Sequence, residues 1–230
     1  MPDLPDWSAA VVGRRALTVG LGAALLQLGA GRTRATADPA FDIQLLQTAA
    51  SVENVLVSTY ETLLAVPLLS GPNANPVLKA LLTTARAQHG DHATACNELA
   101  TKLGGGAQNG PNPGLAQVVN RARPGSSDLG ATVELALQLE LASAQTYHNH
   151  VGLLGDLNAR RLAASILGVE SQHVGLLRVA QALVAARTPD LLSLEGEVRE
   201  RLPPEAATAG FPESFSKSDQ ARPPTEGAVR

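Results

Sequence analysis

Residues 168–175 read GVESQHVG and contain a glutamate and a histidine three positions apart. On a helix this spacing places Glu170 and His173 on the same side, where both side chains can bind one metal ion. The surrounding residues have the pattern of a helix interior, and a buried carboxylate without a partner is energetically costly. The pair therefore predicts a site where a cation compensates buried charge.

Four segments with apolar residues at helical spacing must position this pair, and Gly-, Pro- and Asn-rich stretches separate them. We expect helices at about residues 39–66, 76–103, 128–154 and 158–187. Ala and Leu dominate the composition, with three Phe, two Tyr and one Trp, which favours an all-α fold. Helices of ~27 residues are ~40 Å long and suit a four-helix bundle.

Each expected helix carries ionisable side chains inside its apolar stripe. These candidate metal ligands are Glu53, His89, His92, Glu140, Glu170 and His173. Glu53 and His89 each lie eighteen residues from Gly71 in the first turn, and the second hairpin has a similar symmetry about Gly155. Positions equally far from a turn pair in an antiparallel hairpin, so all six groups are expected to meet at one depth.

Carboxylate oxygen and imidazole nitrogen together suit iron, manganese or zinc. Two alternatives stay open at this point. Glu53 and Glu140 could instead be buried carboxylates that accept hydrogen bonds from tyrosine or arginine. His89 could be an imidazole that holds a carboxylate in place without binding the metal itself.

Other polar residues near the stripes are expected to have structural roles. Tyr60 and Tyr147 each follow a stripe glutamate by seven residues, and we expect core packing with a hydroxyl hydrogen bond. Cys96 is expected to be a small core residue, and His148 and His150 are expected to be solvated. Three further glutamates are assigned to outer faces: Glu61, Glu98 and Glu134.

The ligand pattern resembles that of the ferritin-like superfamily, with one Glu on the first and third helices and E-x-x-H on the second and fourth. Five residues match this pattern: Glu53, His92, Glu140, Glu170 and His173. His89 departs from it, because it stands where the family has Glu. The stretches SVENVLVSTYE and QLELASAQTYH also echo one another.

This resemblance implies an all-α, ferritin-like antiparallel four-helix bundle with a long crossover between the second and third helices. It also implies a centre of iron or manganese that reacts with peroxide or oxygen. Because an imidazole bridges two metals poorly, a mononuclear centre, a mixed pair or a zinc site stays open. The alternative function is a metal-free structural or stress-protective bundle that has kept the fold and lost the centre.

Residues 1–37 resemble a twin-arginine export signal, because Arg14 and Arg15 precede an apolar run over 16–30 and the small residues 35–37. The run is shorter than the ~20 residues of a membrane span, so we expect cleavage and no stable anchor. The sequence thus resembles the exported ferritin-like proteins of bacteria, located in the periplasm, the cell wall or outside the cell.

The remaining chain is expected to form one bundle domain over residues 38–202 and a disordered, Pro-rich tail over 203–230. The formal net charge is −3 and no block of basic residues occurs, which argues against nucleic acid as a partner. Metal ions are the expected partners, and assembly into a homo-oligomer is left open.

Overall fold

A computed structural model describes residues 38–72, 74–122, 128–187 and 219–229. In these residues every regular element is a helix, as the composition predicted. The helices are α1 (Pro39–Ala65), α2 (Pro67–Ser70), α3 (Pro76–Lys102), α4 (Pro113–Ala122), α5 (Leu129–Leu153) and α6 (Leu157–Ala185). The predicted export signal, and residues 203–218 of the predicted tail, lie outside the described residues. None of the described helices is long and apolar enough to span a membrane.

The four long helices begin at side-chain caps that the sequence encodes. Asp38 accepts a hydrogen bond from the amide of Ala40, and Asn75 accepts one from Leu78. Asp128 and Asp156 cap α5 and α6 in the same way. Such caps satisfy backbone amides that have no partner inside the helix, so they fix where each helix starts. The observed ends consequently agree with the predicted ranges to within two residues.

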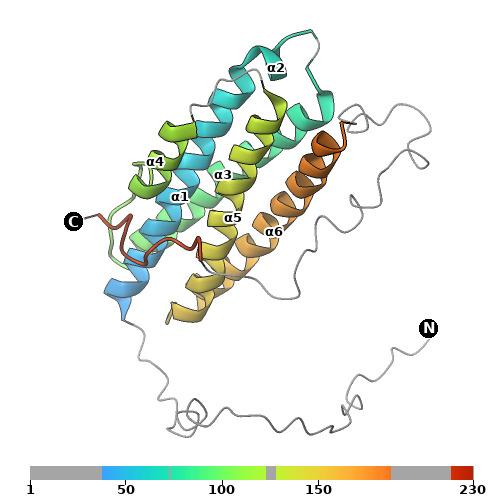
Figure 1. Cartoon of the computed structure of the whole chain (residues 1–230). Helices are drawn as coiled ribbons and strands as arrows, with labels where there is room; N and C mark the ends of the chain where they lie inside the picture. The colour runs from blue at the N-terminus through green and yellow to red at the C-terminus, as the bar shows by residue number, and fades with distance from the viewer. Residues whose placement is uncertain (1–37, 73, 123–127, 188–218, 230) are drawn as a thin grey trace, which may run out of the picture. The chain divides into compact units, whose positions relative to one another are not determined.

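The long helices form two antiparallel hairpins, α1 with α3 and α5 with α6, that pack side by side (Figure 1). The crossover after α3 carries the chain back along the bundle, so α5 starts at the end where α1 finishes (Figure 1). This confirms the predicted bundle and its long connection. The connection contains a ten-residue helix, α4. The helix extends because Leu115 is buried in the core and Val119 packs against it.

The core consists of two apolar clusters with a polar layer between them. One cluster contains Leu56, Leu63, Leu82, Val133 and Leu177 with their neighbours. The other contains Leu45, Leu46, Cys96, Tyr147 and Ile166 with theirs. On α3 and α6 the candidate ligands fall between residues of the two clusters, and on α1 and α5 Glu53 and Glu140 lie near the border between the clusters.

Residues 219–229 lie against α1, α5 and the crossover, which differs from the disorder predicted for the tail. The hydroxyl of Thr48 donates to the carbonyl of Pro224 at 2.7 Å, and the amide of Arg222 donates to the hydroxyl of Thr146 at 2.9 Å. The side chain of Gln145 accepts a further hydrogen bond from the amide of Gln220. Polar side chains of the bundle thus hold the backbone of a segment that has no apolar period of its own, which is why its sequence pattern did not reveal it.

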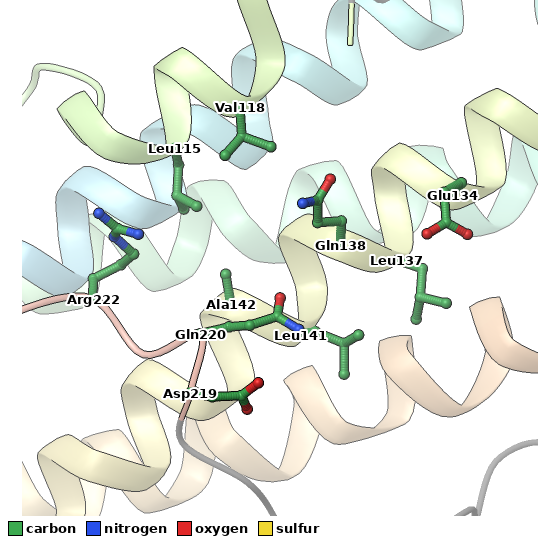
Figure 2. A pocket seen from close by; sticks show the side chains of 10 residues that line it. All are labelled: Leu115, Val118, Glu134, Leu137, Gln138, Leu141, Ala142, Asp219, Gln220 and Arg222. Carbon is green, nitrogen blue, oxygen red and sulfur yellow. The ribbon is translucent and has the colours of Figure 1, made fainter. Parts of the chain in front are cut away.

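A groove of about 420 Å³ lies between α4, α5 and this segment (Figure 2). Its lining is apolar at Leu115, Val118, Leu137, Leu141 and Ala142, and polar at Glu134, Gln138, Asp219, Gln220 and Arg222. None of the six candidate ligands lines it. The groove is therefore separate from the polar layer.

Candidate metal centre

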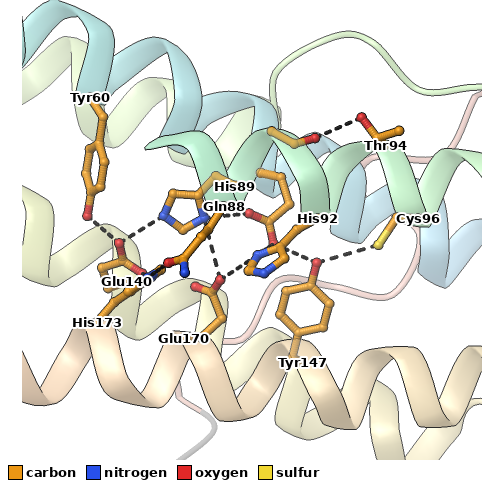
Figure 3. Close-up of polar contacts among 12 residues, drawn as sticks. Tyr60, Gln88, His89, His92, Thr94, Cys96, Glu140, Tyr147, Glu170 and His173 are labelled. Carbon is orange, nitrogen blue, oxygen red and sulfur yellow. Dashed lines mark hydrogen bonds and ion pairs between the residues drawn. The ribbon is translucent and has the colours of Figure 1, made fainter. Parts of the chain in front are cut away.

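The structure brings the six predicted ligands together in the polar layer, from all four long helices (Figure 3). Four of them, Glu53, His89, Glu140 and Glu170, have no solvent-exposed surface. His92 and His173 retain a small exposed fraction, 12% and 6% of their side chains. Among the described residues, the layer therefore comes closest to the surface on the side of α3 and α6, which carry these two histidines.

His89 occupies the middle of the layer, between the carboxylates of the other hairpin and its own. Its Nδ1 lies 2.7 Å from Oε2 of Glu53, and its Nε2 lies 3.0 Å from Oε1 of Glu140. Both ring nitrogens thus face a carboxylate. This geometry fits the role of an imidazole that holds carboxylates, and His89 could bind a metal only by giving up one of these contacts.

The other two histidines each approach a different carboxylate. Nδ1 of His92 lies 3.1 Å from Oε1 of Glu170, and Nδ1 of His173 lies 3.3 Å from Oε2 of Glu140. Two overlapping groups result, and within each the potential ligand atoms lie within 4.8 Å of one another. The groups are Glu53, His89, His92 and Glu170, and His89, Glu140, Glu170 and His173.

Several atoms at this convergence point are buried and have no hydrogen-bond partner. They include both carboxylate oxygens of Glu170 and Nδ1 of His92. The 3.1 Å contact between these residues has the distance of an ion pair without the alignment of a hydrogen bond. Because buried polar atoms are nearly always partnered, oxygen and nitrogen atoms left free at one point fit a bound divalent ion.

Two tyrosine hydroxyls from outside the polar layer donate hydrogen bonds to the carboxylates of Glu53 and Glu140. The hydroxyl of Tyr147 donates to Oε1 of Glu53 at 2.6 Å, and that of Tyr60 donates to Oε1 of Glu140. The predicted hydroxyl hydrogen bonds are therefore present, and each joins α1 to α5. The hydrogen bonds that the tyrosine alternative requires are thus present, and each of these carboxylates contacts a phenol and an imidazole at once.

The charges in the layer shift several pKa values away from their ordinary range. Burial first, and then the charges of Glu53 and Glu140, raise the pKa of the Glu170 carboxyl to about 8. Burial would lower the pKa of His92, but its close contacts with the carboxylates of Glu170 and Glu53 outweigh it and raise the pKa to about 9. Protons therefore occupy positions where a metal cation would bind, and metal binding must release them.

The two tyrosine-bound carboxylates behave differently from Glu170. Burial would raise the pKa of the Glu53 carboxyl, but the hydrogen bond with His89 and the nearby imidazole of His92 outweigh it and lower the pKa. Burial likewise opposes the shift at Glu140, where the charge of His89 lowers the pKa. Burial would lower the pKa of His89, yet Glu140 and Glu170 raise it well above its usual value. The layer is therefore held together by charge in the absence of a metal.

Two features of this region were not found from the sequence. His150, expected to be solvated, is buried beside the ring of Tyr147, because its position on α5 faces the apolar cluster that contains Tyr147. Gln88 contacts the ring of His173, although its position next to His89 gave no signal of this. Cys96 is a buried core residue as predicted, 3.6 Å from the hydroxyl of Tyr147.

The fold and the site together define a helical bundle with carboxylate and imidazole groups at its centre. The chain matches the ferritin-like domain family over residues 41–183, more than half of its length. It therefore belongs to the ferritin-like domain family. No curated protein and no solved structure is significantly similar to the chain.

Proposed function

We propose that this protein binds one or two transition-metal ions in the polar layer, with iron or manganese favoured and zinc as the alternative. The observation that carries the proposal is the convergence of unpartnered, buried ligand atoms of Glu170 and His92. Without a cation these atoms keep a desolvation cost that no hydrogen bond among the described residues offsets.

The two overlapping groups suggest which residues would bind each ion. Glu53 and His92 would hold one ion, Glu140 and His173 the other, and Glu170 has one free oxygen for each. His89 would orient Glu53 and Glu140 from between them. A redox-active ion bound here would supply electron transfer toward peroxide or oxygen, the activity that the family resemblance implies.

Export is part of the proposal, and its support is the sequence alone. The twin arginines Arg14 and Arg15, the apolar run after them and the small residues before Asp38 favour translocation and cleavage. The metal site would then function outside the cytoplasm. N-terminal sequencing of the secreted or periplasmic protein tests this, and an intact N-terminus in the cytoplasmic fraction would contradict it.

Elemental analysis of the purified protein tests metal binding. The wild-type protein should contain one or two equivalents of metal, and the double variant Glu170→Ala with His173→Ala should lose them. Glu98→Ala, an exposed glutamate on α3, is the matched control and should keep the wild-type content. Equal metal content in all three proteins, or none in any, would contradict the proposal.

One observation favours the second candidate function, a metal-free structural bundle. His89 lies between Glu53 and Glu140 at hydrogen-bond distance from both, so a protonated imidazole neutralises charge where a metal would. Thermal unfolding with and without a chelator separates the two functions, because a ligand that binds only the native state raises its stability. An unchanged midpoint would favour the metal-free bundle.

A further inference from the structure

Gln88 lies on α3 at the seam with α6, half-buried, where its side chain reaches the ring of His173 (Figure 3). The side-chain carbonyl oxygen Oε1 of Gln88 is 2.7 Å from Nε2 of His173. This contact joins the two helices on the side where the polar layer comes closest to solvent. It is the only contact of that Nε2 atom among the hydrogen bonds of the described residues.

The chemistry of the two atoms fixes the position of a proton. A carbonyl oxygen can only accept a hydrogen bond, so Nε2 of His173 must carry the hydrogen. The other nitrogen, Nδ1, faces the polar layer, 3.3 Å from Oε2 of Glu140. A metal ion that binds Nδ1 would take the place of this contact.

A comparison with His92 shows why this matters. Nδ1 of His92 also faces the layer, so the two histidines present the same ring nitrogen to the centre. The other ring nitrogen of His173, Nε2, contacts Gln88 at the seam between α3 and α6.

We propose that Gln88 is a positioning residue, which sets the tautomer and the ring orientation of His173 so that Nδ1 is available as a ligand. The consequence for metal binding rests on the proposed function, whereas the tautomer itself does not. Loss of such an outer hydrogen bond typically weakens metal affinity by ~10–100-fold.

Nitrogen-15 NMR of histidine-labelled, metal-free protein tests the tautomer directly. The chain has five histidines, so the signals of His173 can be assigned with a His173→Gln variant. Wild-type protein should keep Nε2 protonated in preference to leaving it bare. Gln88→Leu should lose this preference, and Gln88→Glu should retain it because a carboxylate still accepts. A neutral ring protonated at Nδ1, or identical spectra for wild type and Gln88→Leu, would overturn the inference.

Titration with Co²⁺ tests the consequence, since its visible spectrum reports nitrogen ligands. Gln88→Leu should bind one Co²⁺ about 10–100-fold more weakly than wild type, and Gln88→Glu should restore binding. Gln172→Leu, which changes an exposed glutamine on α6, is the matched control and should bind as wild type does. Equal Co²⁺ affinity for wild type and Gln88→Leu would count against the positioning role. Absence of binding by the wild type would instead refute the proposed metal function, and the NMR result would still decide the tautomer.

Discussion

The phenol of Tyr147 on α5 donates a 2.6 Å hydrogen bond to the carboxylate of Glu53 on α1. The reverse contact also exists, since Tyr60 on α1 donates to Glu140 on α5. Each helix thus supplies one carboxylate and the phenol that holds the carboxylate of the other helix. The repeat seen in the sequence, a tyrosine seven residues after a glutamate, is the pattern that this exchange requires.

Replacing Tyr147 by Phe should destabilise the metal-free protein. The variant removes a hydrogen bond to a buried carboxylate, and such bonds contribute roughly 1.5–3 kcal/mol. We therefore expect a decrease of that size in the free energy of unfolding, measured by chemical denaturation. Tyr60→Phe is the matched variant and should have a similar effect. A decrease well below 1 kcal/mol for both would show that the phenols only fill space.

Replacing Glu170 by Gln should stabilise the metal-free protein at alkaline pH and abolish metal binding. The pKa of Glu170 is about 8 in the folded protein and near 4.5 when unperturbed, so the folded state holds a proton that the unfolded state has lost. Wild-type stability from this group therefore falls as pH rises from about 4.5 to 8. Glutamine stays neutral at every pH, so the stability of the variant does not fall in this range because of position 170.

Denaturation of metal-free Glu170→Gln and wild type across this pH range measures the difference. The advantage of the variant should grow with pH and reach a few kcal/mol, at ~1.4 kcal/mol per unit of pKa shift. Glu134→Gln, on the exposed face of α5, serves as the control. If the stabilities of wild type and Glu170→Gln change with pH in the same way, Glu170 is not the buried carboxyl with a raised pKa that the structure indicates.

His150 should make the protein sensitive to acid. Burial lowers the pKa of its imidazole from 6.5 to about 4, so between these values the unfolded chain binds a proton and the folded protein does not. Stability from this group is thus complete above pH 6.5 and falls as the pH decreases to 4. The loss is on the order of 3 kcal/mol.

The variant His150→Gln should flatten this part of the pH profile of the unfolding free energy. His148→Gln, an exposed neighbour on the same helix, should leave the profile unchanged. Identical profiles for wild type and His150→Gln would contradict the burial seen in the structure.

Replacing Gly227 by Ala should release residues 219–229 from the bundle. An added Cβ would clash with Oγ of Ser51 and lie 2.9 Å from Cα of Thr48, and the helix backbone cannot move away easily. Hydrogen exchange of the amides in 219–229 should accelerate in this variant. Gly152→Ala, where a Cβ meets nothing within 4 Å, is the control and should not change that exchange. Unchanged exchange in both variants would mean that the segment is not held as described.

Much of the fold was predictable because local signals and periodicity agreed. An Asp or Asn cap starts each long helix, and the apolar stripes define which face is buried. The meeting of the six candidate ligands followed from equal distances to the turns, a purely geometric argument. Long, strongly periodic helices are the case in which such reasoning works best.

The remaining features depend on contacts that leave no periodic trace. Gln88 reaches His173 across 85 positions in the chain, and neither residue type predicts the other. Residues 219–229 dock through hydrogen bonds between their backbone atoms, which any sequence offers, and the side chains of Thr48, Gln145 and Thr146. The low apolar content of residues 219–229 therefore predicted disorder, although side chains of the bundle hold this segment in place by hydrogen bonds.

The docking of residues 219–229 also determines which part of the protein folds last during synthesis. Thr48 meets Pro224, which a ribosome adds 176 residues later, after every helix of the bundle has been made. A growing chain can thus close its hairpins while the outer side of α1 is still bare. The final covering of that helix is a step that takes place late in translation or after it.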